Sequence, residues 1–410
     1  MDSLLLETAK YALGRISSGT EGRHDLLYAI RDLDFLEEPI FGETLERNTQ
    51  RFDRMKYPKI DANTERQLGY FWIPSEISLE ADRNNFQSGK ISPSQKELIT
   101  KVIRKLIFFD SLQGRAPFLL YGQITSLPEA ENNFLSWSFF EGVIHSRSYT
   151  EIARKVYPDP DELFEGSHEI PVLVKHEKSV TKRYNEFYDY VILYNLMETF
   201  GVKKPPEFMK EFRKKLLLSL FNVNVLEGIR FYPGFASVWA IQETTGTVPG
   251  ISETLKFICR DENVHLDLVV KYLKILRDSK EEGFSEIYEE TIPELDRMYK
   301  EAAEEEFEWT EYLFEGGVDI VGYNEDIAKE YVAYVCNRRL AVLGRPPAFP
   351  DVKSNPIPWI GKYVMSSGGD KKENVSSAET LPQEKSAVSD YVIGVAGGSV
   401  DEAFEEDVYE

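Results

Sequence analysis

The sequence predicts an all-α protein. Apolar residues recur at helical spacing over long segments, and the chain shows neither a strong run of alternating strand residues nor a solenoid-type repeat. Residues 216–240 are apolar on almost every face, which is typical of a helix buried on all sides. The chain has 410 residues, of which 42% are hydrophobic, and this is ample for a large core around that helix.

The N-terminal part of the chain is weakly patterned. Residues 1–37 are a mildly amphipathic extension, and the break at residues 38–42 leads into the folded body. A helical period then continues through Trp72 until Pro74 ends it.

Two capping patterns predict the starts of the next helices. The sequence Ser92-Pro93-Ser94-Gln95 begins a helix that runs to Asp110 on its apolar side. A second capping box, at residues 126–129, begins the following helix. One stripe of that helix carries residues three or four apart: Phe134, Trp137, Ser138, Glu141, His145, Tyr149 and Ile152.

The remaining helical patterns cover most of the chain up to residue 343. They lie at residues 184–200, at 216–240, around His265, at 284–314 and at 325–343. Pro233 removes one backbone hydrogen bond inside the buried segment, so we expect a kink near Ile229.

Composition excludes several classes of function. A net charge of −22 argues against non-specific binding of nucleic acid, which requires a basic surface. The start of the chain lacks the basic residues and cleavage site of a signal peptide. Residues 216–240 could span a bilayer by length, but their central polar residues and Pro233 argue against a membrane helix. Two cysteines without a C-x-x-C pair indicate reduced thiols and a cytoplasmic protein.

Charged residues inside the apolar segments indicate a metal site. Glu227 lies in the middle of the buried segment, where an unpaired charge would cost several kcal/mol. About one helix later, Glu262 and His265 are three residues apart and share one helix face. A lone Glu on one helix and an E-x-x-H on another are half of a carboxylate-bridged dimetal site.

The other half of such a site is found upstream. Asp110 lies on an apolar face, and Glu141 and His145 share the stripe of the helix that follows. Four carboxylates and two imidazoles suit two iron or manganese ions. The other three histidines, His24, His168 and His176, have polar neighbours in the sequence, so we expect them at the surface.

Tyr149 follows His145 by one helical turn on the same face. It is either a core tyrosine or a phenol that oxidised metal ions convert to a radical. Phe231 and Phe235, which otherwise simply belong to the core, would keep such a radical dry.

Together these residues resemble the small, radical-generating subunit of class I aerobic ribonucleotide reductase. The resemblance covers residues 38–410 and rests on five segments: Asp110-Ser-Leu-Gln-Gly-Arg115, His145-Ser-Arg-Ser-Tyr149-Thr, Leu226-Glu227-Gly-Ile-Arg-Phe231-Tyr, Arg260-Asp261-Glu262-x-x-His265 and Ser354-Asn-Pro-Ile-Pro-Trp359-Ile. It implies a ferritin-like helical bundle over residues 38–365 that forms a homodimer.

The resemblance also implies a function. Two iron ions, or manganese ions, react with oxygen and oxidise Tyr149, and the radical passes reversibly to a cysteine of the large subunit, where ribonucleotides are reduced to deoxyribonucleotides for DNA replication. Trp72 and Asp261 match the inner relay toward His145, and Tyr391 matches the tyrosine that bridges the two subunits.

Residues 366–410 differ in composition from the rest of the chain. Acids far outnumber bases and apolar residues are sparse, so we expect a disordered tail. Its isolated hydrophobic residues suggest a peptide that docks on a partner, which by resemblance is the large subunit. The alternative is a solvated tail whose hydrophobic residues are incidental.

One departure from the family pattern affects the metal site. The family has E-x-x-H, whereas this chain has Glu141-Gly-Val-Ile-His145, with Gly142 at the expected ligand position. A regular helix could still offer an i, i+4 pair to the metal ions, or a π-bulge could absorb the extra residue. In a third arrangement Glu141 points away and water takes its place.

Two other functions compete with the radical-generating subunit. A ferritin-like di-iron oxidase or desaturase would use the same ligands without Tyr149, Trp72 or the tail. A metal-poor inactive paralogue, or one with a variant radical, would tolerate the altered spacing before His145.

Overall fold

The fold is a bundle of long helices. The computed structural model describes residues 2–19, 36–45, 49–279 and 283–364, and these residues contain no β-strand. The helices are α1 (Ser3–Ser17), α2 (Pro58–Gly69), α3 (Glu80–Ser88), α4 (Pro93–Gln113), α5 (Pro128–Phe139), α6 (Ser146–Val156), α7 (Asp161–Phe164), α8 (Pro171–Thr199), α9 (Pro206–Val225), α10 (Tyr232–Thr245), α11 (Pro249–Asp278), α12 (Phe284–Phe314), α13 (Glu325–Val342) and α14 (Gly361–Val364). The all-α prediction is confirmed.

Short turns of other helix types lie between these helices. Single π turns are found at Phe118–Gly122, Phe140–His145 and Leu226–Arg230, and 3₁₀ turns at Pro74–Glu76, Ser167–Glu169 and Pro358–Ile360. The second π turn joins α5 to α6, and the third joins α9 to α10. A π turn inserts one residue into a helix, which changes the face on which later side chains lie.

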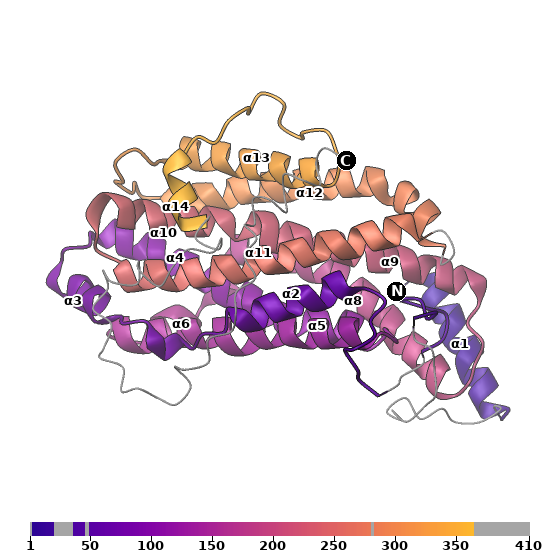
Figure 1. Cartoon of the computed structure of the whole chain (residues 1–410). Coiled ribbons are helices and arrows are strands. Elements are labelled where there is room, and N and C mark those ends of the chain that lie inside the picture. Colours follow the sequence, from indigo (N-terminus) through magenta and orange to yellow (C-terminus); the bar gives the residue numbers. More distant parts are fainter. Residues whose placement is uncertain (1, 20–35, 46–48, 280–282, 365–410) are drawn as a thin grey trace.

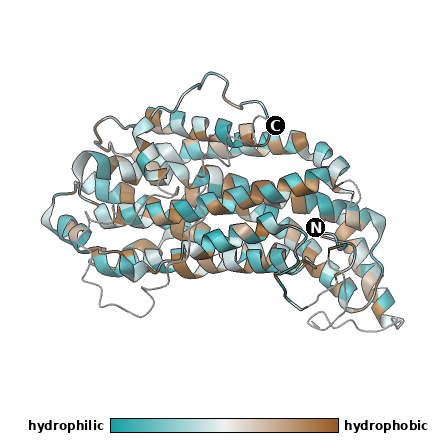
Figure 2. Ribbon diagram, in the orientation of Figure 1, coloured by the Kyte–Doolittle hydropathy of each residue, from teal (hydrophilic) through white to brown (hydrophobic). Residues whose placement is uncertain are grey.

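The long helices run roughly parallel or antiparallel to one another. In Figure 1, α12 and α13 lie side by side along one edge, α11 crosses the middle of the view, and α2 lies against α5 below it. Figure 2 shows polar and apolar residues interleaved along the visible helices, as expected of amphipathic helices around a shared core. No helix among the described residues is long and apolar enough to cross a membrane.

The predicted central helix is interrupted. Every residue from 216 to 240 is buried, as the apolar pattern indicates, but α9 ends at Val225 and α10 begins at Tyr232. The interruption is the π turn that contains Ile229, close to the kink expected from Pro233.

Several other element predictions are confirmed or corrected. The capping box of α4 is present, since the Gln95 backbone N–H donates to Ser92 Oγ at 3.2 Å. The second capping box was wrong: Leu127 is the residue before α5, and Glu129 accepts from the backbone N–H of Tyr57 at 2.9 Å instead. The helix leading to Trp72 ends earlier than predicted, at Gly69.

Two corrections concern α8 and its surroundings. The helix begins at Pro171, well before the predicted start at residue 184. Proline at its first position favours a helix start there, and the first half of the helix is polar. His176, which we expected at the surface, is fully buried, and its Nδ1 lies 3.4 Å from Glu306 Oε1. The polar sequence neighbours of His176 lie on other faces of α8, so they conceal its burial against α12. His168 is exposed as expected, and His24 lies outside the described residues.

Candidate metal centre

The six residues that the sequence proposed as metal ligands lie together in the structure. They come from α4, from the π turn after α5, from the π turn after α9 and from α11, and all are fully buried. Their ligand atoms form two overlapping groups, each within 4.8 Å: Asp110, Glu141, His145 and Glu262, and Glu141, Glu227, Glu262 and His265. Because two acids are shared, the arrangement can hold two neighbouring ions.

Both histidines present Nδ1 to the shared carboxylates. His145 Nδ1 lies 3.3 Å from Glu141 Oε2 and 3.2 Å from Glu262 Oε1. His265 Nδ1 lies 2.9 Å from Glu141 Oε1 and 3.3 Å from Glu262 Oε2. The two imidazoles therefore face the same carboxylates from different helices.

The second nitrogen of each histidine is held by an outer partner. His145 Nε2 lies 3.2 Å from Asp261 Oδ2, and His265 Nε2 lies beside the side-chain amide of Gln67. At His145 the Asp261 carboxylate oxygen can accept the Nε2 proton, which leaves the Nδ1 lone pair available to a metal ion. Such outer partners are usual for metal-binding histidines.

The residues present fit a metal pair. Asp110 Oδ1 and Glu227 Oε2 are buried and have no hydrogen-bond partner among the described residues. Leaving such oxygens unsatisfied is costly, whereas a bound cation satisfies them directly. Carboxylate oxygens with one imidazole per ion are the donor set that iron and manganese prefer.

A π turn brings Glu141 into the cluster despite the extra residue. The N–H of Ser146 donates to the C=O of Glu141, five residues earlier, so the insertion at Gly142 is absorbed within residues 140–145. Of the three arrangements that the sequence left open, the structure has the π-bulge, with Glu141 directed at both histidines.

A contact between two glycines accompanies this π turn. Gly114, at the end of α4, lies so close to Gly142 that a Cβ on Gly114 would be 2.5 Å from Gly142 Cα. No L-side chain fits there without moving backbone. The contact lets the end of α4, which carries Asp110 one turn earlier, approach the π turn that carries Glu141.

Glu227 is positioned by residues that the sequence did not identify. Its Oε1 accepts from Gln113 Nε2 at 2.6 Å and from Trp137 Nε1 at 3.1 Å. Tyr184 in turn donates to Gln113 Oε1 at 2.8 Å, which fixes the orientation of the amide. With Oε1 occupied, Oε2 is left for the cluster and lies 3.8 Å from His265 Nδ1.

Tyr149 directly contacts the cluster. Its hydroxyl donates to Asp110 Oδ2 at 2.5 Å, and the ring is fully buried. Burial and the neighbouring Asp110 carboxylate raise the pKa of Tyr149 well above its ordinary value, so the phenol keeps its proton. Phe231 packs on Phe109, which precedes Asp110, and on Phe235, so these aromatic rings lie near Asp110.

A continuous hydrogen-bonded path leads from His145 toward Trp72. Asp261 Oδ2 lies 3.2 Å from His145 Nε2 and accepts from Trp72 Nε1 at 2.8 Å. Asp261 Oδ1 pairs with Arg260 at 3.2 Å. Trp72 is buried and stacks on Phe257 at a ring-centroid distance of 5.2 Å. Tyr391 lies outside the described residues.

In the metal-free protein the cluster holds protons. Burial raises the pKa values of Asp110, Glu227 and Glu262 well above the ordinary range, and the Glu141 carboxylate raises them further. Burial opposes protonation of His145 and His265, but their carboxylate partners outweigh it and raise both pKa values.

We therefore expect metal binding to weaken as the pH falls from neutral to mildly acidic. The three acids and both histidines must release protons to bind metal, and their raised pKa values retain those protons to higher pH. The raised pKa values also mean that the metal-free protein binds more protons when it is folded than when it is unfolded. Its free energy of unfolding should therefore fall as the pH rises through this range. Calorimetric metal titration in buffers of different ionisation enthalpy measures the proton release; binding without proton release would contradict the prediction.

Comparisons with known proteins agree on one family. A family model described as "Ribonucleotide reductase, small chain" matches residues 50–356. The beta subunit of ribonucleoside-diphosphate reductase from Buchnera aphidicola subsp. Baizongia pistaciae is 34% identical over 374 residues, covering 90% of this chain and 95% of that protein. The reductase 1 beta subunit of Escherichia coli O157:H7 is 33% identical over the same shares.

Solved structures give the same fold. The ribonucleotide reductase R2 subunit from Clostridium botulinum aligns with a TM-score of 0.65 and 25% identity, covering 82% of this chain and 99% of that one. Streptococcus sanguinis dimanganese(II)-NrdF aligns with a TM-score of 0.60 and 22% identity, covering 78% of this chain and all of that one.

Proposed function

This chain belongs to the family of ribonucleotide reductase small chains, and from that premise we propose which of its residues carry the activity. A small chain of ribonucleoside-diphosphate reductase is an oxidoreductase subunit that acts with a large subunit. The observation that carries the proposal is the buried cluster of four carboxylates and two imidazoles with the Tyr149 hydroxyl on one of the acids.

We propose that six residues hold two metal ions: Asp110, Glu141, His145, Glu227, Glu262 and His265. Iron is the metal we favour. Manganese accepts the same ligands, and the structural neighbour from Streptococcus sanguinis is itself a dimanganese(II) protein. When bound and exposed to oxygen, the metal pair supplies the oxidising power that removes an electron from a nearby phenol.

Tyr149 is the phenol that becomes the radical. Its oxidation removes one electron and one proton, and Asp110 Oδ2 is placed 2.5 Å away to accept that proton. Exclusion of water by complete burial protects the radical from quenching.

Trp72 and Asp261 form the inner end of the radical relay. Asp261 holds the Nε2 of His145 and the indole N–H of Trp72 on one oxygen, so the metal cluster and the indole share a hydrogen-bonded link. An oxidase or desaturase explains the ligands but has no use for this link. A metal-poor paralogue has no use for six converging donors.

The tail, residues 366–410, is proposed to carry the radical path to the large subunit through Tyr391 and to dock there. Truncation after Met365 should leave metal content and the Tyr149 radical unchanged but abolish deoxyribonucleotide formation and binding to the large subunit. The assay combines reductase turnover with a binding measurement on the purified large subunit. Full turnover by the truncated chain would show that the tail is dispensable.

The chain is proposed to form a homodimer through α2 and α5. Five large apolar side chains are 37–55% exposed on these helices and the residues that follow them: Leu68, Phe71, Leu135, Phe139 and Val143. Apolar surface gathered in this way usually marks a protein interface.

The Leu135→Glu/Phe139→Glu variant should therefore sediment as a monomer. Introducing two charges into an apolar interface costs desolvation without providing partners. The matched control is Val321→Glu, since Val321 is 81% exposed between α12 and α13. A double variant that still sediments as a dimer would exclude this face.

A cytoplasmic location remains our proposal, supported by the two free cysteines.

A further inference from the structure

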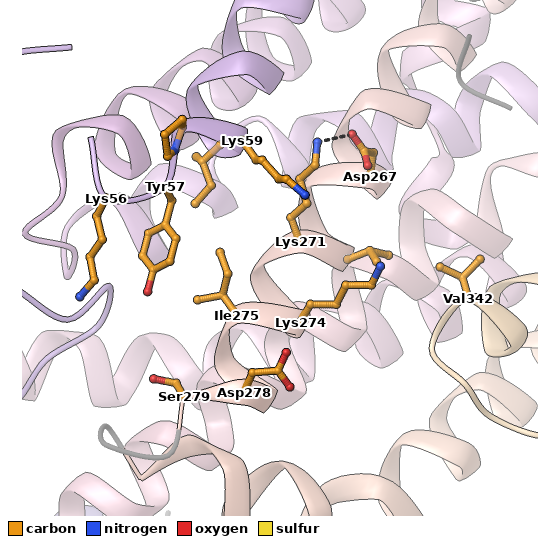
Figure 3. A pocket seen from close by; sticks show the side chains of 13 residues that line it. Lys56, Tyr57, Lys59, Asp267, Lys271, Lys274, Ile275, Asp278, Ser279 and Val342 are labelled. Carbon is orange, nitrogen blue, oxygen red and sulfur yellow. Dashed lines mark hydrogen bonds and ion pairs between the residues drawn. The ribbon is translucent and has the colours of Figure 1, made fainter. Parts of the chain in front are cut away.

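The surface cavity between α2 and α11 contains an ion pair of the ordinary exposed kind. Lys271 and Asp267, both on α11, pair at 2.7 Å across one helical turn, and Figure 3 shows the two side chains meeting at the cavity wall. A pair within one helix does not fix that helix against its neighbours. Buried pairs that join different helices can do so.

A group of buried charges around Glu306 joins four elements of the bundle. Glu306 on α12 pairs through Oε2 with Lys105 Nζ of α4 at 2.5 Å. Its Oε1 lies 3.6 Å from Arg230 Nη1 of the π turn after α9 and 3.4 Å from His176 Nδ1 of α8. Arg230 also donates to Glu305 Oε2 at 2.6 Å. The side chains of Lys105, His176, Arg230 and Glu306 are buried, each with no more than 3% of the residue exposed.

The charges of this group balance one another. Two cations, Lys105 and Arg230, face two acids, Glu305 and Glu306. Burial and the two neighbouring cations lower the pKa of His176 well below its ordinary value, so its imidazole is neutral. A buried ion pair adds little net stability, because removing both charges from water costs about as much as their attraction returns. Its directional bonds can instead select one arrangement of the elements that carry it.

The elements joined by Glu306 carry the two acids that the metal positions do not share. Asp110, which belongs only to the first group of ligand atoms, follows Lys105 by five residues on α4. Glu227, which belongs only to the second group, lies three residues before Arg230 in the same π turn. Helix α12 supplies none of the six proposed ligands. Glu306 therefore links both ligand-bearing elements from outside the metal cluster.

An aromatic contact lies between this group of charges and the metal cluster. The ring of Phe109, the residue before Asp110, packs on Phe231 with 5.8 Å between the ring centroids, and Phe231 directly follows the π turn. The His176 imidazole lies parallel to the Phe109 ring at 6.5 Å, and Lys105 Nζ lies 5.4 Å from the centre of the same ring. Because interiors are closely packed, a shift of Lys105 or His176 would move Phe109 and the backbone beside it.

We propose that Glu306 is a positioning residue of the metal centre, which fixes α4 and the π turn after α9 relative to one another. The separation of the Asp110 and Glu227 carboxylates, and with it that of two bound ions, then depends on ion pairs outside the ligand set. The inference rests on the six ligands proposed above and adds what sets their spacing. Precise placement matters, because a small displacement of a ligand changes metal affinity and the coupling between the ions.

Electron paramagnetic resonance of the full-length chain, loaded with manganese(II) in the absence of oxygen, tests the proposal. The spectrum of a manganese pair reports the exchange coupling between the ions, which depends on their separation and on the bridging ligands. The Lys105→Met/Glu306→Gln variant removes one cation and one acid at nearly constant side-chain volume, and Arg230 keeps Glu305 as its partner. We expect this variant to bind the second ion at least about tenfold more weakly and to show an altered coupling when both ions are bound.

Two single variants complete the test. Glu306→Asp keeps the charge but shortens the side chain by one methylene, so it should also alter the coupling. Lys271→Met is the matched control. Lys271, like Lys105, lies on a helix that carries proposed ligands, but its ion pair stays within α11, and Asp267 keeps Arg66 as a partner. The spectrum and the metal affinity of this control should equal those of the unmodified chain.

An unchanged coupling in both Glu306 variants, with two ions bound, would overturn the proposal. It would do so even if their melting temperatures fell, because Glu306 would then have only a structural role. If the double variant does not fold, the coupling in Glu306→Asp decides the question alone. The absence of a coupled pair in the unmodified chain would overturn the proposed metal centre itself, and this inference with it.

Discussion

The Tyr149→Phe variant should keep its fold and its two metal ions but form no tyrosyl radical on exposure to oxygen. The substitution removes only a hydroxyl, and that hydroxyl is the group which donates to Asp110 Oδ2 at 2.5 Å. Losing one buried hydrogen bond costs about 1 kcal/mol, which a domain of this size tolerates. Reductase turnover should fall to background, because position 149 then has no phenol that can carry the radical.

Tyr184→Phe is the matched control for this prediction. Tyr184 is also fully shielded from solvent near the cluster, but its hydroxyl donates to Gln113 and not to a proposed metal ligand. Electron paramagnetic resonance should detect the radical in this control and none in Tyr149→Phe. A normal radical signal in Tyr149→Phe would move the radical to another residue.

The Glu141→Ala variant should bind at most one metal ion per chain and form no Tyr149 radical. Glu141 belongs to both groups of ligand atoms and contacts Nδ1 of both histidines, so its removal weakens both metal positions. The metal-free variant should be less stable than the unmodified chain, because Glu141 pairs with both buried histidines and its removal leaves them without that partner. The increase in melting temperature on metal addition should also shrink, because fewer metal ions bind.

Two further variants test whether the loss of metal binding arises at the π turn that carries Glu141. Glu131→Ala removes an acid that lies outside the cluster on α5 and should leave metal content unchanged. Gly114→Ala puts a Cβ 2.5 Å from Gly142 Cα, so it should displace Glu141 and lower metal affinity about tenfold or more. Gly69→Ala, with open space around the new Cβ, is its control. Two ions and a full radical yield in Glu141→Ala would show that Glu141 is not a ligand.

The cluster of proposed metal ligands could be anticipated from sequence because charged residues are rare on apolar helix faces. Glu227 among apolar neighbours and the Glu262–His265 pair need partners in any fold, and metal is the partner that accounts for all of them. Spacing alone could then place the side chains on inward faces, and the structure brings them together.

The residues that position these ligands could not be predicted in the same way. Gln113, Gln67 and Tyr184 carry no charge, and their pattern is that of ordinary polar residues on a helix. Their roles arise from contacts between helices far apart in sequence, such as Gln67 of α2 with His265 of α11. One signal was present, since Gln113 lies one turn after Asp110 on the same face of α4.

The choice between a regular helix and a π-bulge also lay outside sequence periodicity. The stripe before the insertion, ending at Glu141, joins the stripe that begins at His145 without a break, so both geometries keep the apolar face inward. The decisive contact is tertiary: Gly114 of α4 admits the backbone of Gly142. The buried position of His176 was missed for a similar reason, because its partners come from α12.

An anomalous-scattering experiment on crystals of the iron-loaded protein tests the central claim most directly. We predict two iron peaks per chain, one among Asp110, Glu141, His145 and Glu262, and the other among Glu141, Glu227, Glu262 and His265. A single peak, or two peaks with the Glu141 carboxylate turned away from both, would contradict the account of this metal centre.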